Sequence, residues 1–194
     1  KGASNPDLQL TAIEYLGMFG GKENQQLLSD VYASTSDVAI KRSILKGYMV
    51  SGQKDRLLAA AKSEANASLR SDAIRMLGAQ GASAELMQLY QVEKTAELKN
   101  ALIDAFMATG NLDRLLDIAR TETDPKVKLK AVRTLGVLGS AKTGPILVEM
   151  YSAPGATPEI KRAAMDGLLI QGNAKALVDM ARKETDPGLR KDLV

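Results

Sequence analysis

The sequence predicts an all-α fold: an α-solenoid of about six stacked antiparallel helix pairs followed by a truncated seventh. One observation is a glycine that recurs every 29 to 33 residues, and a second is an aliphatic anchor twelve residues before each glycine. The third is an apolar pattern of helical period between them, where a strand would show period two. The glycines are Gly20, Gly52, Gly81, Gly110, Gly139 and Gly172. The anchors are Leu8, Ile40, Leu69, Leu98, Val127 and Ile160, and Leu189 opens the seventh repeat.

The first helix of each repeat begins with a capping residue and carries its apolar side chains on one face. In the third repeat these are Leu69, Ala73, Ile74 and Leu77, a spacing that lines one side of an α-helix. Three residues before every anchor stands a residue whose side-chain oxygen suits a helix N-cap. These residues are Asn5, Asp37, Asn66, Thr95, Asp124, Thr157 and Asp186. The glycine that closes each segment suits a left-handed helix C-cap.

A shorter second helix is expected after each glycine, as in residues 57–61 and 115–119. Repeats 1 and 5 are longer, and we expect about three extra residues in the turn between their two helices. Both also end their second helix with a tyrosine, Tyr32 and Tyr151. These shared features indicate a higher-order duplication of four repeats.

We predict a single repeat domain over residues 1–194. Its repeats span approximately residues 5–36, 37–65, 66–94, 95–123, 124–156, 157–185 and, in part, 186–194. A helix pair in such an array buries its apolar face only against its neighbours, and terminal repeats normally carry a polar outer face. No such capping repeat is visible in the sequence. We therefore expect a fragment of a larger protein whose ends can self-associate end to end.

The composition excludes several classes of chemistry. The chain has no Cys, no His and no Trp, and its 26 Lys+Arg against 23 Asp+Glu give a net charge of +3. There can be no disulfide framework, thiolate zinc site, cysteine nucleophile or Ser-His-Asp triad. We expect no catalytic residue, cofactor or metal site, and no membrane-spanning segment. A chain without Cys suits a reducing cytosol and an exported protein equally, so no compartment is assigned.

A column of basic residues follows the anchors. One position after each anchor stand Lys41, Arg70, Lys99, Lys128, Lys161 and Arg190, while the first repeat has Gln9. This position lies about 100° around the helix from the anchor, within the buried stripe. We expect the aliphatic stems to pack between repeats and the charges to reach a cap Asp or a helix-end carbonyl. We therefore interpret the column as a structural inter-repeat ladder and not as a phosphate-binding surface.

The opposite face of the first helices is the candidate partner-binding surface, expected to be concave. It consists of Arg42, Lys46, Val50, Arg75, Arg133, Val137, Arg162 and Ile170. The acids Glu14, Asp72, Asp104 and Asp166 share this face. Mixed charge with scattered aliphatic residues suits a polypeptide better than a nucleic acid, which selects a basic stripe. The alternative is an ordinary solvated face.

The segments 124–136 and 186–190, each opening with Asp-Pro, resemble HEAT-like repeats. The closest similarity is to the short bacterial form that is also found in phycobilisome lyase proteins, and it covers roughly residues 5–194. The resemblance implies an α-solenoid in which the Asp-Pro-capped helices line the concave side. The intact Asp-Pro pair occurs in only two repeats.

We expect a non-catalytic scaffold that binds a protein or peptide. One alternative is a nucleic-acid-binding module similar to the HEAT-like DNA glycosylases, which a pI near 9.0 permits. The lack of Trp and the interleaved acids argue against it, because unstacked bases need aromatic platforms. The other alternative, a lyase-type enzyme, rests only on the family resemblance, and fold analogy does not establish chemistry.

Overall fold

The computed structural model describes residues 6–19, 21–139 and 141–192. Over these residues it contains helices and no strand, so the predicted all-α solenoid class is confirmed. The chain divides into two compact units, Lys1–Lys94 and Thr95–Val194. The division falls between the predicted third and fourth repeats. The single domain over residues 1–194 stays a prediction.

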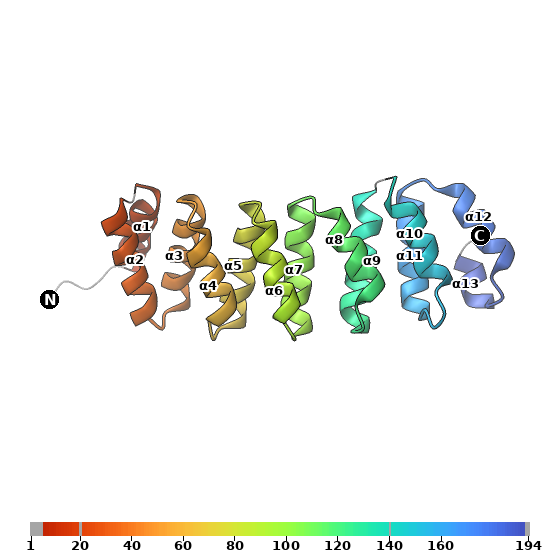
Figure 1. The fold of residues 1–194 in the computed structure, drawn as a ribbon, viewed down its shortest axis with the longest axis horizontal. Helices are drawn as coiled ribbons and strands as arrows, with labels where there is room; N and C mark the ends of the chain where they lie inside the picture. Colours follow the sequence, from red (N-terminus) through yellow and green to blue (C-terminus); the bar gives the residue numbers. More distant parts are fainter. Residues whose placement is uncertain (1–5, 20, 140, 193–194) are drawn as a thin grey trace. The chain divides into compact units, whose positions relative to one another are not determined.

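Unit 1 contains three helix pairs. Its helices are α1 (Pro6–Met18), α2 (Lys22–Ser34), α3 (Val38–Val50), α4 (Lys54–Ser63), α5 (Ala67–Ala79) and α6 (Ser83–Val92). The odd-numbered helices α1, α3 and α5 pack side by side in sequence order, and each even-numbered helix packs against them (Figure 1). Each helix pair is therefore one repeat, and neighbouring repeats bury the core between them.

Unit 2 repeats this arrangement and ends with one further helix. Its helices are α7 (Ala96–Ala108), α8 (Leu112–Thr121), α9 (Pro125–Leu138), α10 (Thr143–Ser152), α11 (Pro158–Ile170), α12 (Ala174–Lys183) and α13 (Pro187–Asp192). The helices α7, α9, α11 and α13 contact one another in succession (Figure 1).

The predicted caps are where the sequence places them. Asp37, Asn66 and Asp124 each accept two backbone N–H groups from the first turn of the following helix. Each described repeat glycine has a positive φ, from 54° at Gly139 to 72° at Gly52, which favours a residue without a side chain. The predicted cap Asn5 and the predicted closing glycine Gly20 lie outside the described residues.

The extra residues of repeats 1 and 5 differ from the expectation. In repeat 1 they lengthen the second helix, since α2 has 13 residues and α4 has 10. Lys22 and Glu23 are good helix formers, and Glu23 places an acidic side chain in the first turn, which favours helix over turn. In repeat 5 part of the extra length lies after α10, at Pro154-Gly155, where Gly155 has φ 78°. A proline followed by a glycine with positive φ makes a turn, so the helix ends at Ser152.

The odd helices come closest together at two pairs of glycines. A Cβ built on Gly17 of α1 would lie 2.5 Å from the Cα of Gly47 of α3. A Cβ built on Gly136 of α9 would lie 2.6 Å from the Cα of Gly167 of α11. These pairs join repeat 1 to repeat 2 and repeat 5 to repeat 6, so each includes one of the two repeats that carry the extra residues and the tyrosine. The two glycine contacts are therefore a further similarity between repeats 1 and 5, and they agree with the expected duplication of four repeats.

Most anchors are buried, and the first one is not. Leu69, Val127 and Leu189 are 3% exposed or less. Leu8, predicted as a core anchor, is 66% exposed, because no helix pair precedes α1 in the described residues. Tyr15 of α1 and Phe19, which directly follows this helix, are also exposed and stack with ring centroids 6.0 Å apart. End-to-end self-association through this surface stays a prediction.

Candidate functional site

Four of the ladder cations form ion pairs with glutamates at the ends of the even helices. The Nζ atom of Lys41 lies 2.9 Å from Glu64, and that of Lys99 lies 2.8 Å from Glu122. The other two pairs are Arg70 with Glu93 at 2.5 Å and Lys161 with Glu184 at 3.2 Å. These glutamate side chains are only 6% to 8% exposed. Each glutamate is the C-cap of an even helix, so the pair holds the two helices of one repeat together.

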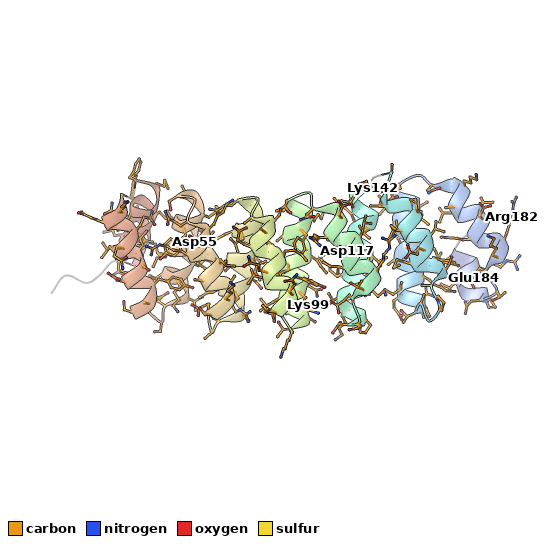
Figure 2. All side chains as sticks on the ribbon, viewed as in Figure 1. Asp55, Lys99, Asp117, Lys142, Arg182 and Glu184 are labelled. Atoms are coloured by element: carbon orange, nitrogen blue, oxygen red, sulfur yellow. The ribbon has the colours of Figure 1, made fainter. Side chains whose placement is uncertain are left out.

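In three of these carboxylates, the second oxygen accepts a hydrogen bond from the start of the next repeat. The backbone N–H groups of the N-cap residues Asn66, Asp124 and Asp186 donate to Glu64, Glu122 and Glu184 at 2.9 to 3.1 Å. The carboxylate therefore joins an odd helix, its even helix and the start of the following odd helix. Figure 2 labels Lys99 and Glu184, both in the lower half of unit 2, with Lys142 at the upper edge.

The glutamate partners were missed at the sequence level. The prediction named a cap Asp or a helix-end carbonyl, whereas the acceptor is a glutamate two residues before the cap. The available signal was the repeated Glu-x-Asn, Glu-x-Thr and Glu-x-Asp pattern at Glu64, Glu93, Glu122 and Glu184. The carbonyl alternative does occur, since Arg70 also donates to the carbonyl of Ala61 at 2.9 Å.

Two of these sites include a tyrosine from the preceding repeat. Tyr32 donates its hydroxyl to Glu64 at 2.8 Å, and Tyr151 donates to Glu184. The Nζ of Lys41 lies 4.9 Å from the ring centroid of Tyr32, a cation–π contact. Lys161 lies at 5.1 Å over Tyr151 in the same way. Three successive helices thus meet at each tyrosine.

These contacts shift the protonation equilibria. The hydrogen bond from Tyr151, followed by the Asp186 N–H and the Lys161 ammonium, lowers the pKa of Glu184 to about 2. At Glu64, burial by itself would raise the pKa of the carboxyl. Hydrogen bonds from Lys41, from the Asn66 N–H and from Tyr32 outweigh burial, so the pKa is lowered. Burial and the adjacent carboxylates raise the pKa of Tyr32 and of Tyr151. All these groups bind one another within the fold. We therefore interpret their pKa shifts as a result of structural contacts and not as a sign of acid–base catalysis.

The last two ladder cations have no carboxylate partner among the described residues. Lys128, partly buried, reaches the carbonyl oxygen of Arg120 at 3.4 Å, close to the end of α8. Arg190 is exposed on α13. Repeat 5 has Ala153 at the C-cap position where repeats 2, 3, 4 and 6 have a glutamate.

In unit 1 the candidate binding residues lie on α3 and α5. Lys46, Val50 and Arg75 are exposed, with Val50 at 59%. Arg42 is partly buried and donates to Asp72 at 2.7 Å. Asp72 was expected on the exposed face but is only 9% exposed, because Arg42 from α3 and Arg75 from its own helix both bind it.

In unit 2 the candidate residues lie on α9 and α11. Arg133, Val137, Arg162 and Ile170 are exposed, with Val137 at 59% and Ile170 at 64%. Arg162 forms an ion pair with Asp192 of α13 at 2.9 Å. Leu169, which is 68% exposed beside Ile170, was not among the predicted residues. We use the name odd-helix face for these exposed residues: Lys46, Val50 and Arg75 in unit 1, and Arg133, Val137, Arg162, Leu169 and Ile170 in unit 2.

The described residues hold no group of three or more acidic side chains that could bind a metal ion. In the same part of the chain, every helix is too short or too polar to traverse a bilayer.

A family model of HEAT repeats matches residues 112–194. This part of the chain is similar to HEAT repeats. The match confirms the predicted HEAT-like resemblance, and it covers repeats 5 and 6, the second helix of repeat 4 and the partial repeat 7. HEAT repeats are generally protein-interaction scaffolds and are usually non-catalytic. The finer similarity to the short bacterial form stays a prediction. No curated protein matches the chain.

Proposed function

We propose that the protein is a non-catalytic scaffold that binds a polypeptide on its odd-helix face. One observation carries the proposal: the same pair of exposed residues, a cation and a valine one helical turn apart, occurs at equivalent positions of repeats 2 and 5. The pairs are Lys46 with Val50 on α3 and Arg133 with Val137 on α9. Residues four apart on a helix lie on the same side, so each pair offers a charge beside an apolar contact.

The cations of these pairs are available to a partner. Neither Lys46 nor Arg133 has an ion pair in the described part of the chain, whereas neighbouring cations are already neutralised. Lys130 pairs with Asp104 at 2.5 Å, and Arg162 pairs with Asp192. The face therefore presents isolated positive charges between ion pairs and aliphatic side chains. A polypeptide with acidic and apolar side chains complements such a surface.

Nucleic acid fits this face less well. Its binding relies on many cations that neutralise successive phosphates, and here internal acids already neutralise Arg42, Lys130 and Arg162. A lyase activity would need a free acid or base. Tyr151 and Glu184, whose pKa values are shifted, instead bind each other in the ladder.

The experiment compares two triple variants. The test variant carries Lys46→Ala, Arg75→Ala and Arg133→Ala. The matched control carries Lys62→Ala, Lys175→Ala and Lys183→Ala, which removes the same charge from exposed positions of even helices. Partners are isolated on the wild-type protein and their affinity is then measured with each variant by titration.

We expect the test variant to bind its partner about tenfold more weakly, since three interfacial charges together contribute about 1–2 kcal/mol. The control should bind as the wild type does. Equal binding by all three proteins would contradict the assignment of the face. Labelled DNA is titrated in parallel over a salt series. Tight binding with a steep salt dependence would favour the nucleic-acid alternative.

A further inference from the structure

A groove of about 430 Å³ lies beside the ladder cation of repeat 5. Lys128 lines it together with Thr157, the N-cap residue of α11. Its apolar walls include Met150, Pro154 and Ile160. The groove lies where α9 and α11 begin, and none of the residues of the odd-helix face lines it.

The chain itself shows what its ladder cations bind. In repeats 2, 4 and 6 one oxygen of a glutamate accepts from the ladder lysine, and the other accepts from the N-cap N–H of the next odd helix. In repeat 4 these contacts are Lys99 to Glu122 at 2.8 Å and the Asp124 N–H to Glu122 at 2.9 Å. A carboxylate is therefore the group that this arrangement of one lysine and one N–H recognises.

Repeat 5 keeps the donors and lacks the carboxylate. Ala153 is the C-cap residue there, with φ −62° and ψ 135°. Glu122 has almost the same backbone conformation, φ −66° and ψ 132°. The difference is therefore in the side chain and in the loop that follows, which has three residues between C-cap and N-cap where repeat 4 has one.

The two donors have no carboxylate within the described residues. Lys128 makes only its 3.4 Å contact with a carbonyl, and the Thr157 N–H has no acceptor among the described residues. Three acids near these donors are already engaged. Glu122 binds Lys99 at 2.8 Å, and Glu149 binds Arg120 at 3.0 Å. The exposed Glu159 carboxylate accepts from the Thr157 side chain and from its own backbone N–H. The groove thus contains a partly buried positive charge with apolar walls around it.

Repeat 1 provides the contrast. It has Thr35 at the C-cap position of its second helix and Gln9 at the ladder position, so cation and carboxylate are absent together. Repeat 5 has lost the glutamate and retained the lysine. A lysine that has no internal carboxylate and lies beside a groove is explained if the carboxylate comes from another molecule.

We propose that the repeat-5 groove binds the glutamate side chain of a partner polypeptide. One oxygen of the glutamate accepts from Lys128 and the other from the Thr157 N–H, while apolar residues flanking the glutamate contact Met150 and Ile160. Phosphate is the competing anion. Arg120 also lines the groove but is paired with Glu149. Lys128 and the Thr157 N–H are then two donors for the two oxygens of a carboxylate, as in repeats 2, 4 and 6. This site is separate from the odd-helix face, so either proposal can fail alone.

The experiment uses the whole chain and a blocked peptide, Ala-Leu-Glu-Leu-Ala, with its Gln counterpart as the matched probe. Binding is followed by NMR through the backbone amide of Thr157, which should move downfield as it donates to the carboxylate. We expect a Kd of about 1 mM for such a short peptide. Lys128→Met and Ala153→Glu should each weaken binding about tenfold or more, the second because the introduced carboxylate occupies Lys128. Lys126→Met, at an exposed lysine of the same helix, is the control and should not change it.

Three results would overturn the proposal. One is the absence of any Thr157 shift at about 10 mM peptide, well above the expected Kd. Another is an equal response to the Gln peptide, which would show that the charge is not recognised. The last is tighter binding of inorganic phosphate than of the Glu peptide, which would assign the groove to a phosphate group. The test variant of the odd-helix face, which keeps Lys128, should bind the peptide normally.

Discussion

Replacing Gly136 by alanine tests whether the glycine contact between α9 and α11 holds these helices at their close spacing. The added Cβ would lie 2.6 Å from the Cα of Gly167, whereas ordinary contact begins near 3.4 Å. The obstacle is backbone, so no side chain can rotate away. The two helices must separate, and neighbouring core side chains such as Val132 and Leu168, now fully buried, lose contacts.

The expected cost follows from two opposing effects. Overpacking a close helix contact costs about 1–3 kcal/mol. Alanine is favoured over glycine within a helix by about 1 kcal/mol, which offsets part of it. We therefore expect Gly136→Ala to lower the free energy of unfolding by about 1 kcal/mol, the middle of the ~0–2 kcal/mol that these two effects leave. With a urea dependence of about 2 kcal/mol/M, the unfolding midpoint should fall by about 0.5 M.

The assay is urea unfolding followed by circular dichroism, with Gly144→Ala as the matched control. A Cβ on Gly144 of α10 meets only the side-chain ends of Asn173 at 3.3 Å and Gln171 at 3.5 Å, which can move aside. Because alanine is also favoured over glycine in this helix, the control should leave the midpoint unchanged or raise it, and should not lower it. A Gly136→Ala variant that is as stable as the wild type, or more stable, would contradict the close approach of α9 and α11 at this glycine pair.

Three further predictions concern caps and ionisable groups. Because the pKa of Glu184 is about 2 when folded and about 4.3 when unfolded, it contributes stability above pH ~4.3 that is lost as the pH falls toward 2. Glu184→Gln should therefore flatten the acid side of a stability–pH profile. Tyr32 and Tyr151, with raised pKa values, should ionise above the ordinary tyrosine pKa of ~10 in an alkaline absorbance titration, and the stability they contribute is lost as the pH rises above ~10. Asp124→Ala, which removes two cap hydrogen bonds, should cost about 1 kcal/mol in thermal unfolding.

Structural features that depend on a few neighbouring residues, such as helix caps, are predicted well from the sequence. An N-cap such as Asp124 and a C-cap glycine such as Gly139 are local requirements of the backbone, and both occur where predicted. The helical period of the apolar residues likewise determines which face of each odd helix packs inward. The exposed candidates Lys46 and Arg133 follow directly from this geometry.

Contacts between distant residues were harder to predict. Lys41 and Glu64 are 23 residues apart, and the spacing of anchors does not reveal which acid meets the lysine. Asp72 was assigned to the exposed face by its angle on the helix, yet two arginines bind it in a buried position. Leu8 matched the anchor pattern, but burial of an anchor depends on a preceding helix pair. The groove beside Lys128 depends on the Pro154-Gly155 turn, whose position the repeat lengths alone did not give.

The proposed binding role is tested most directly by site-specific photo-crosslinking at three valines. Val50 and Val137 lie on the odd-helix face and are each 59% exposed, whereas Val178 lies on α12 and is 49% exposed. With a photoreactive residue at each position in turn, a polypeptide adduct is expected at Val50 and at Val137 and not at Val178. Adducts confined to Val178, or adducts formed with nucleic acid at the first two positions, would contradict the account.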